Sequence, residues 1–215
     1  MQELSAVDRK TVKTLANVFY QVVPLNLRTY CHLTAEISKT VLQDFGISAT
    51  VVPCQLLCAT SDHNYAIGFV GNPPKDGKWD GHAICVAGDW FIDTAISHLQ
   101  IQFGIDVPPV AFAPRFTVPT QVIGRINCSE RQCLWWYHPP QGADTRMPEE
   151  PASLISEYSS QLIGKLSETI GNMPTVRATR ESPYCFNDTR EEKGNERQVY
   201  ETAQKLCSPS RLYGH

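Results

Sequence analysis

Residues 80–95, DGHAICVAGDWFIDTA, carry the two side chains best suited to acid–base chemistry. Apolar and polar residues alternate on both sides of Ala87 and Gly88, which is typical of a β-hairpin. A two-residue turn at these positions would set His82 directly opposite Asp93, and directly opposed residues share a face with their Cβ atoms about 5 Å apart. The carboxylate would then orient the imidazole and stabilise its protonated form. The segment therefore predicts a histidine base held by an aspartate.

Cys31 is the candidate nucleophile for this pair. It stands in NLRTYCHLTAEIS, in the first turn of a predicted helix, where partial positive charge and free backbone N–H groups favour a thiolate. The same N–H groups would supply part of an oxyanion hole. His32 is a rival base, but its side chain points about 100° away around the helix, so we expect it to face solvent or to lie behind the reacting groups. Together Cys31, His82 and Asp93 predict a Cys-His-Asp triad.

Each member of this triad also has a structural explanation. A histidine beside a strand, an aspartate at a turn or helix start, and a single cysteine in a helix are more often structural than catalytic. The combination of a helix-start cysteine with a paired histidine and aspartate favours the catalytic interpretation.

Three helices are predicted around these residues. The first begins at Ser5, which caps it with the help of Asp8, and ends at Pro24. The second spans about 30–45 and stops at a glycine. The third, 152–171, has the apolar stripe of an amphipathic helix.

The strand signals lie between the second and third helices. Strand-like runs occur at 47–59 and 65–71, and a further hairpin is expected from 121–128 and 132–139. Prolines punctuate 106–119, which favours an extended wrap over the surface. Helices, then an antiparallel sheet, then a helix predict an α+β fold.

The chain divides by composition into a domain, 1–173, and a polar C-terminal appendage, 174–215. The appendage contains the charged run TREEKGNER and few large apolar residues, so it cannot bury enough surface to order itself alone.

Overall composition excludes several classes of partner. The chain has 215 residues, a net charge of −3 and an isoelectric point near 6.1, so it lacks the electrostatic footprint of a nucleic-acid-binding or anionic-membrane-binding protein. No run is long and apolar enough for a membrane span, and the charged N-terminus does not resemble a signal peptide. We expect a cytoplasmic protein, or one delivered outside the cell by a route that needs no cleavable signal.

The eight cysteines do not form the pattern of a disulfide scaffold. Cys54, Cys58 and His63 imitate a zinc pattern, but residues four apart in a strand are about 13 Å from each other and cannot hold one ion. Buried, inert thiols are expected instead. Cys128 and Cys133 are expected to face each other across a turn as a reduced pair. No metal or other cofactor is predicted.

The order of these motifs resembles the papain-like cysteine hydrolase superfamily, over roughly residues 14–100. GHAICVAGDWFIDTA is most similar to the transglutaminase-like and arylamine N-acetyltransferase-like branches, where the aspartate lies one strand after the histidine, and more loosely to bacterial cell-wall amidases. The resemblance implies a papain-like fold with Cys31 as nucleophile, His82 as general acid and base, and Asp93 as the residue that orients it. The glutamine usual before the nucleophile is missing, which leaves Gln21 and Asn26 as candidate oxyanion donors.

Three functions are compatible with this sequence. The first is hydrolysis of an amide bond in a peptide, protein or cell-wall substrate through an acyl-enzyme. The second is acyl transfer, transglutamination or glutamine deamidation by the same triad. The third is a non-catalytic binding module. Trp79 and Tyr30 are candidates for contacting the substrate. The remaining tryptophans would either line a groove with Trp79 or pack in the core; these are Trp90, Trp135 and Trp136.

Overall fold

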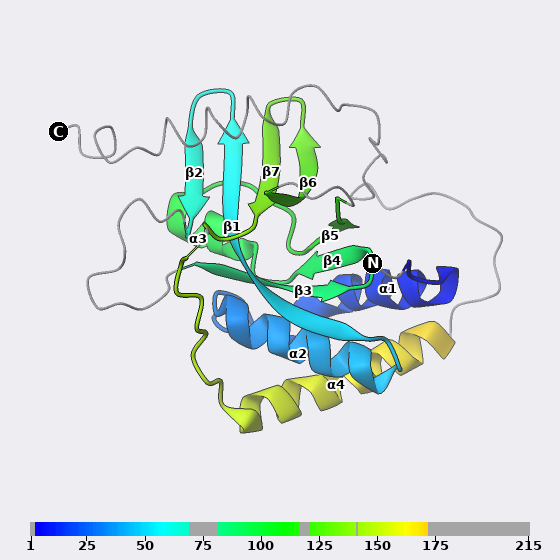
Figure 1. Cartoon of the computed structure of the whole chain (residues 1–215). Helices are drawn as coiled ribbons and strands as arrows, with labels where there is room; N and C mark the ends of the chain where they lie inside the picture. The colour runs from blue at the N-terminus through cyan, green and yellow to red at the C-terminus, as the bar shows by residue number, and fades with distance from the viewer. Residues whose placement is uncertain (1–2, 69–80, 117–120, 141, 172–215) are drawn as a thin grey trace.

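The computed structural model describes residues 3–68, 81–116, 121–140 and 142–171. It is an α+β structure in which three helices form a layer beneath an antiparallel sheet, as predicted (Figure 1). The expected domain limit at 173 and the C-terminal appendage lie outside the described residues.

The helical layer consists of α1 (Ala6–Val22), α2 (Cys31–Asp44) and α4 (Ala152–Gly171). The hydroxyl of Ser5 accepts the N–H of Asp8 at 3.1 Å, which is the cap predicted for α1. Helix α4 packs against both α1 and α2 and buries Leu162 and Leu166 between them. Helix α2 also packs on the sheet, so its first residue, Cys31, is held at the boundary between the two layers.

The sheet is organised around one long strand, β1 (Ala49–Thr60). The first half of β1 pairs with β3 (His82–Ala87), and its second half pairs with β2 (Asn64–Ile67) on one side and β7 (Gln132–Tyr137) on the other. Beyond β3 follow β4 (Trp90–Asp93) and β5 (Ala111–Pro114), and beyond β7 follows β6 (Val122–Ser129).

The two ends of the sheet approach each other. After β5, the N–H of Phe116 donates to the carbonyl of Ile123 in β6 at 2.9 Å. The sheet is therefore nearly closed, and it encloses an apolar interior that contains Ile84, Phe91 and Trp136. A second core lies between the helices and the outer face of β3 and β4.

The prediction of an extended wrap for the proline-rich region 106–119 was wrong for residues 111–114. Residues 111–114 form strand β5 rather than an irregular wrap, and Pro114 stands opposite Trp90 at the last position of the strand. Proline is tolerated at the end of a strand at the edge of a sheet, because its missing N–H has no partner to lose. A short helix, α3 (Ser97–Phe103), follows β4 and ends at Gly104, so a helix begins shortly after Asp93, as the structural explanation of that residue allowed.

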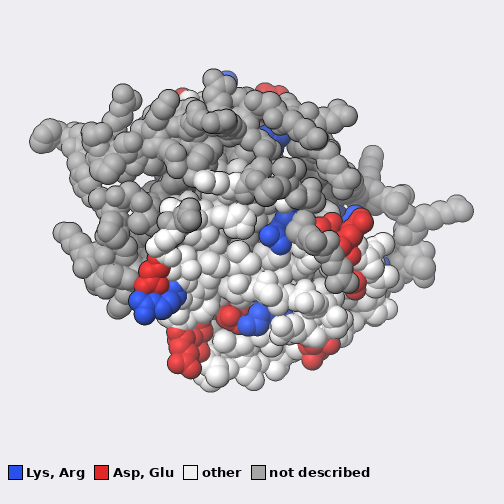
Figure 2. Space-filling model, viewed as in Figure 1, with Lys and Arg blue, Asp and Glu red and all other residues white. Residues whose placement is uncertain are grey.

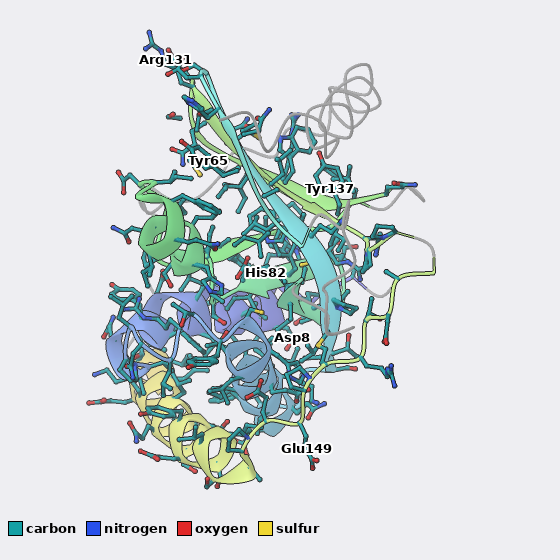
Figure 3. The ribbon with its side chains drawn as sticks, turned by 90° about the vertical axis from the view of Figure 1, so that its left-hand side faces the viewer. Asp8, Tyr65, His82, Arg131, Tyr137 and Glu149 are labelled. Carbon is teal, nitrogen blue, oxygen red and sulfur yellow. The ribbon has the colours of Figure 1, made fainter. Side chains whose placement is uncertain are left out.

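Alternation along β3 decides which core each side chain enters. Ala83, Cys85 and Ala87 face the helices, whereas Ile84 and Val86 face the enclosed interior. His82 shares the interior face and is fully buried. Figure 3 shows it where the sheet meets the helical layer.

The charged residues on the surface in Figure 2 form small groups of both signs rather than a patch of one sign. Within the described ranges, no helix is long and apolar enough to span a membrane.

Candidate active site

The hairpin that carries His82 and Asp93 turns one residue later than predicted. Ala87 pairs with Trp90, so the turn consists of Gly88 and Asp89, with Gly88 at a positive φ of 54°. His82 is therefore not directly opposite Asp93, and the predicted register is wrong. Moving the turn by one residue shifts the strand partner of His82 by two positions, so His82 and Asp93 still lie on the same face of the sheet. The two side chains become diagonal neighbours, a separation that a long polar pair can still bridge.

His82 and Asp93 form a hydrogen-bonded ion pair in the sheet interior. Nε2 of His82 lies 2.6 Å from Oδ2 of Asp93, and neither side chain is exposed to solvent. The carboxylate also accepts the indole N–H of Trp136 at 2.7 Å and the backbone N–H of Ala95 at 2.9 Å. Three donors thus satisfy Asp93 and offset the hydration that this carboxylate loses by burial.

This environment sets the charge of the imidazole. Burial alone lowers the pKa of His82, but the charge and hydrogen bond of Asp93 and the nearby Cys31 thiol raise it from 6.5 to about 10. A carboxylate only accepts, so Nε2 carries the proton shared with Asp93. The other ring nitrogen, Nδ1, is buried and makes no hydrogen bond. His82 is therefore a cation at neutral pH with one N–H left to donate.

Cys31 shares a pocket with this free nitrogen. A pocket of about 190 Å³ is lined by Cys31 and His82 together with residues from three neighbouring segments: Thr29, Tyr30, His32, Gly81, Ala83, Met147, Pro148 and Glu150. The thiol Sγ is 3.9 Å from the carbonyl oxygen of Gly81, directly before β3. The side chain of Tyr30 does not cap α2, so the first-turn N–H groups remain available next to the thiol.

A larger hollow of about 410 Å³ lies at the far tips of the hairpins, lined among others by Thr60, Arg131 and Cys133. Burial raises the pKa of Cys133 to about 11, so this thiol stays protonated. The hollow contains neither the His82–Asp93 pair nor Cys31. The smaller pocket is therefore the candidate active site.

The structure brings together only some of the predicted site residues. Tyr30 lines the pocket and is 59% exposed. Gln21 and Asn26 do not line it, and the Gln21 amide instead donates to the carbonyl of Asn17 in its own helix. Trp79 lies outside the described residues. His32 lines the pocket and faces two carboxylates, rather than open solvent.

Trp136 is the site residue that the sequence did not identify as such. The sequence predicted that Trp136 would line a groove or pack in the core. Its indole N–H also donates to the Asp93 carboxylate from β7, 43 residues away in sequence. A buried indole N–H usually needs an acceptor, which is the only local signal for this role. Trp90 instead stacks on Phe112 with 4.4 Å between ring centroids, and Trp135 is 5% exposed on the sheet.

The thiols of Cys54 and Cys58 are both buried in β1. In the part of the chain that the structure describes, no group of three histidine, cysteine or carboxylate side chains could hold a metal ion. The six described cysteines, which include Cys128 and Cys133, are free thiols.

The backbone closes tightly beside His82. Gly68, at a φ of 76°, lies so near Gly81 that a Cβ atom on it would be 2.5 Å from the Gly81 Cα. The side-chain amide of Gln55 donates to the carbonyl of Gly68 at 2.8 Å and fixes this position. The residues on either side of segment 69–80 are therefore held together at the start of β3.

The raised pKa of His82 predicts that folding stability falls as the pH rises. The folded chain holds this proton more tightly than the unfolded chain, so its stabilisation is complete below pH 6.5 and is lost between 6.5 and about 10. We expect the free energy of unfolding to fall by up to about 1.4 kcal/mol per pH unit within this window. Urea titrations at a series of pH values measure the slope.

The interval from about pH 7 to about pH 8.5 isolates His82 from other groups. Burial lowers the pKa of His98 and His138, so these groups change the free energy of unfolding only at lower pH. Burial raises the pKa of thiols such as Cys85, so these groups change it only at higher pH. Asp93→Asn should remove the slope. An unchanged slope in that variant would show that another group is responsible.

Comparison of the chain with protein-family models, with curated proteins and with solved structures gave no significant match.

Proposed function

We propose that the protein is a cysteine-dependent hydrolase of amide bonds, with a papain-like arrangement of its helices and sheet. The observation that carries the proposal is the buried His82–Asp93 pair, whose one unused N–H lies in the same pocket as the Cys31 thiol. A cationic imidazole beside a thiol at a helix start stabilises the thiolate, the reactive form of cysteine. The sequence resemblance to papain-like cysteine hydrolases implies the same roles for Cys31, His82 and Asp93, and it supports the proposal.

Acylation begins when the Cys31 thiolate attacks the amide carbon and forms a C–S bond. The negative charge that develops on the carbonyl oxygen is stabilised by the uncapped N–H groups of the first turn of α2. His82 then gives its Nδ1 proton to the nitrogen of the leaving amine as the C–N bond breaks. The products are a neutral His82, a free amine and a thioester on Cys31.

Deacylation reverses the roles. Neutral His82 takes a proton from water, the oxygen attacks the thioester carbon, and the C–S bond breaks to release the carboxylic acid and the thiolate. Asp93 remains a carboxylate and holds the imidazole through Nε2 in both steps. Acyl transfer and deamidation share the first half-reaction, so one test of the thiol covers all these activities and separates them from a binding module.

Iodoacetamide at neutral pH should alkylate Cys31 first. Burial raises the pKa of each of the other five described cysteines, so these thiols remain protonated: Cys54, Cys58, Cys85, Cys128 and Cys133. Peptide mapping by mass spectrometry over time gives each rate. The labelled protein should carry serine at 185 and 207, because Cys185 and Cys207 lie outside the described residues.

His82→Ala is the matched comparison, because it removes the cation and leaves the thiol. We expect Cys31 to react at least about tenfold more slowly in this variant. Uniform, slow labelling of all cysteines, or labelling of Cys31 that is independent of His82, would favour a binding module instead.

A further inference from the structure

The candidate active-site pocket contains a carboxylate that the proposed mechanism does not use. Glu150 lines the pocket from the segment between β7 and α4, and its side chain is only 13% exposed. A carboxylate that is mostly withdrawn from water needs a cation or several donors to offset its lost hydration.

The charges around Glu150 leave it incompletely paired. Glu36, the other carboxylate near the pocket, is neutralised by Lys39, with 2.5 Å between Nζ and Oε2. His32 lies between the two acids, 3.7 Å from Glu36 and 3.3 Å from Glu150. The Nδ1 atom that faces Glu150 makes no hydrogen bond. Among the described residues, Glu150 therefore has one ionisable neighbour, His32, and no hydrogen-bond donor.

A second group in the same pocket also lacks a partner. His82 is fully buried, lines the pocket and has an Nδ1 atom without a hydrogen bond. The pocket thus contains the Nδ1 donor of His82 beside the thiol and, at Glu150, a carboxylate that accepts no hydrogen bond from the described residues. A volume of about 190 Å³ admits a group the size of one residue. A ligand that satisfies both positions carries a positive charge close to the group that Cys31 attacks.

We propose that Glu150 binds a protonated primary amine of the substrate, so that the protein acts on amides with an ammonium group within about one residue of the scissile carbonyl. This inference rests on the proposed function, since it describes what the same pocket selects. An ammonium ion supplies three donors and a full charge, which a carboxylate with a single imidazole neighbour lacks. A carboxylate substituent at that position is disfavoured for the same electrostatic reason.

Methanethiosulfonate reagents test the charge preference without a known substrate. The 2-aminoethyl reagent is cationic, the 2-sulfonatoethyl reagent is anionic and the methyl reagent is neutral. Each transfers its thioalkyl group to the Cys31 thiolate, forming a disulfide and releasing methanesulfinate. Second-order rates are measured in the full chain with serine at 185 and 207, and each is divided by the rate with N-acetylcysteine.

The charge preference is the normalised rate of the cationic reagent divided by that of the anionic reagent. We expect this ratio to be about ten in the wild-type protein, and Glu150→Gln to lower it by about fivefold or more. Glu149→Gln is the matched control. It removes the same charge one residue away, from an exposed side chain that points away from the body of the protein (Figure 3). It should change the ratio by less than about twofold.

The outcomes separate this inference from the proposed function. Equal ratios in Glu150→Gln and Glu149→Gln would overturn the role of Glu150. The proposed function would still stand in that case if the neutral reagent reacts rapidly with Cys31 and the reaction depends on His82. A neutral reagent that reacts with Cys31 no faster than with N-acetylcysteine would instead contradict the proposed function. Glu150→Asp retains the charge and should retain the ratio. If thermal melting shows that Glu150→Gln does not fold, Glu150→Ala takes its place and should lower the ratio equally.

Discussion

Replacing Cys31 with alanine should abolish formation of an acyl-enzyme while leaving the fold intact. The thiol is the only group in the proposed mechanism that bonds to the substrate, and loss of such a nucleophile lowers rates by at least about 10⁴-fold. Cys31 is half-buried at the edge of the helical core, its thiol makes a long contact with the Gly81 carbonyl, and alanine is the best helix former. We therefore expect the free energy of unfolding to change by less than about 1 kcal/mol.

p-Nitrophenyl acetate serves as the acyl donor for this experiment. Wild-type protein should release a burst of one equivalent of nitrophenol and carry an acetyl group on Cys31, as read by mass spectrometry. Cys85→Ala is the matched control, because Cys85 is fully buried against the helices. It should lower stability but retain the burst. If Cys31→Ala unfolds the chain, Cys31 is a core residue, and if the burst persists, another residue is the nucleophile.

Asp93→Asn should have the second-largest effect, on activity and stability together. The carboxylate accepts from His82, Trp136 and Ala95, whereas an amide has one accepting oxygen and an NH₂ group that donates. One of these donors loses its acceptor, and the imidazole is driven to the tautomer whose proton sits on the wrong nitrogen. We expect acylation to fall about 10³- to 10⁴-fold and the free energy of unfolding to fall by about 3 kcal/mol or more.

The acetate burst and urea unfolding measure both effects. Trp136→Phe is the comparison, because it removes one donor to Asp93 and leaves the His82 contact in place. It should cost about 1–3 kcal/mol of stability and less than about tenfold in rate. Full activity in Asp93→Asn would show that a different residue orients His82.

Local signals predicted α1, α2 and α4 because the causes of these helices lie within a few residues. Ser5 and Asp8 form the expected cap, Gly46 follows α2 at a φ of 74°, and α4 has the predicted limits of 152–171. The shared face of His82 and Asp93 could also be predicted, since moving a hairpin turn by one residue moves the strand pairing by two and preserves the face.

Contacts between distant segments could not be predicted in this way. Trp136 reaches Asp93 from β7, and Glu150 reaches the pocket from the segment before α4. Both positions depend on how β1 pairs with two different neighbours along its length, which no local pattern encodes. The proline content likewise predicted no strand at β5. The strand forms because its pairing with β4 outweighs the intrinsic disfavour of proline at a strand end.

The contact between Gly68 and Gly81 makes the position of His82 independent of the length of the chain between these two glycines. Residues inserted or deleted between two fixed anchors change the closure entropy slowly, by about 0.6 kcal/mol for each doubling of length, and they leave the start of β3 in place. His82 directly follows the second anchor and so keeps its position. Changes of length between the two anchors can therefore accumulate without displacing the buried His82–Asp93 pair.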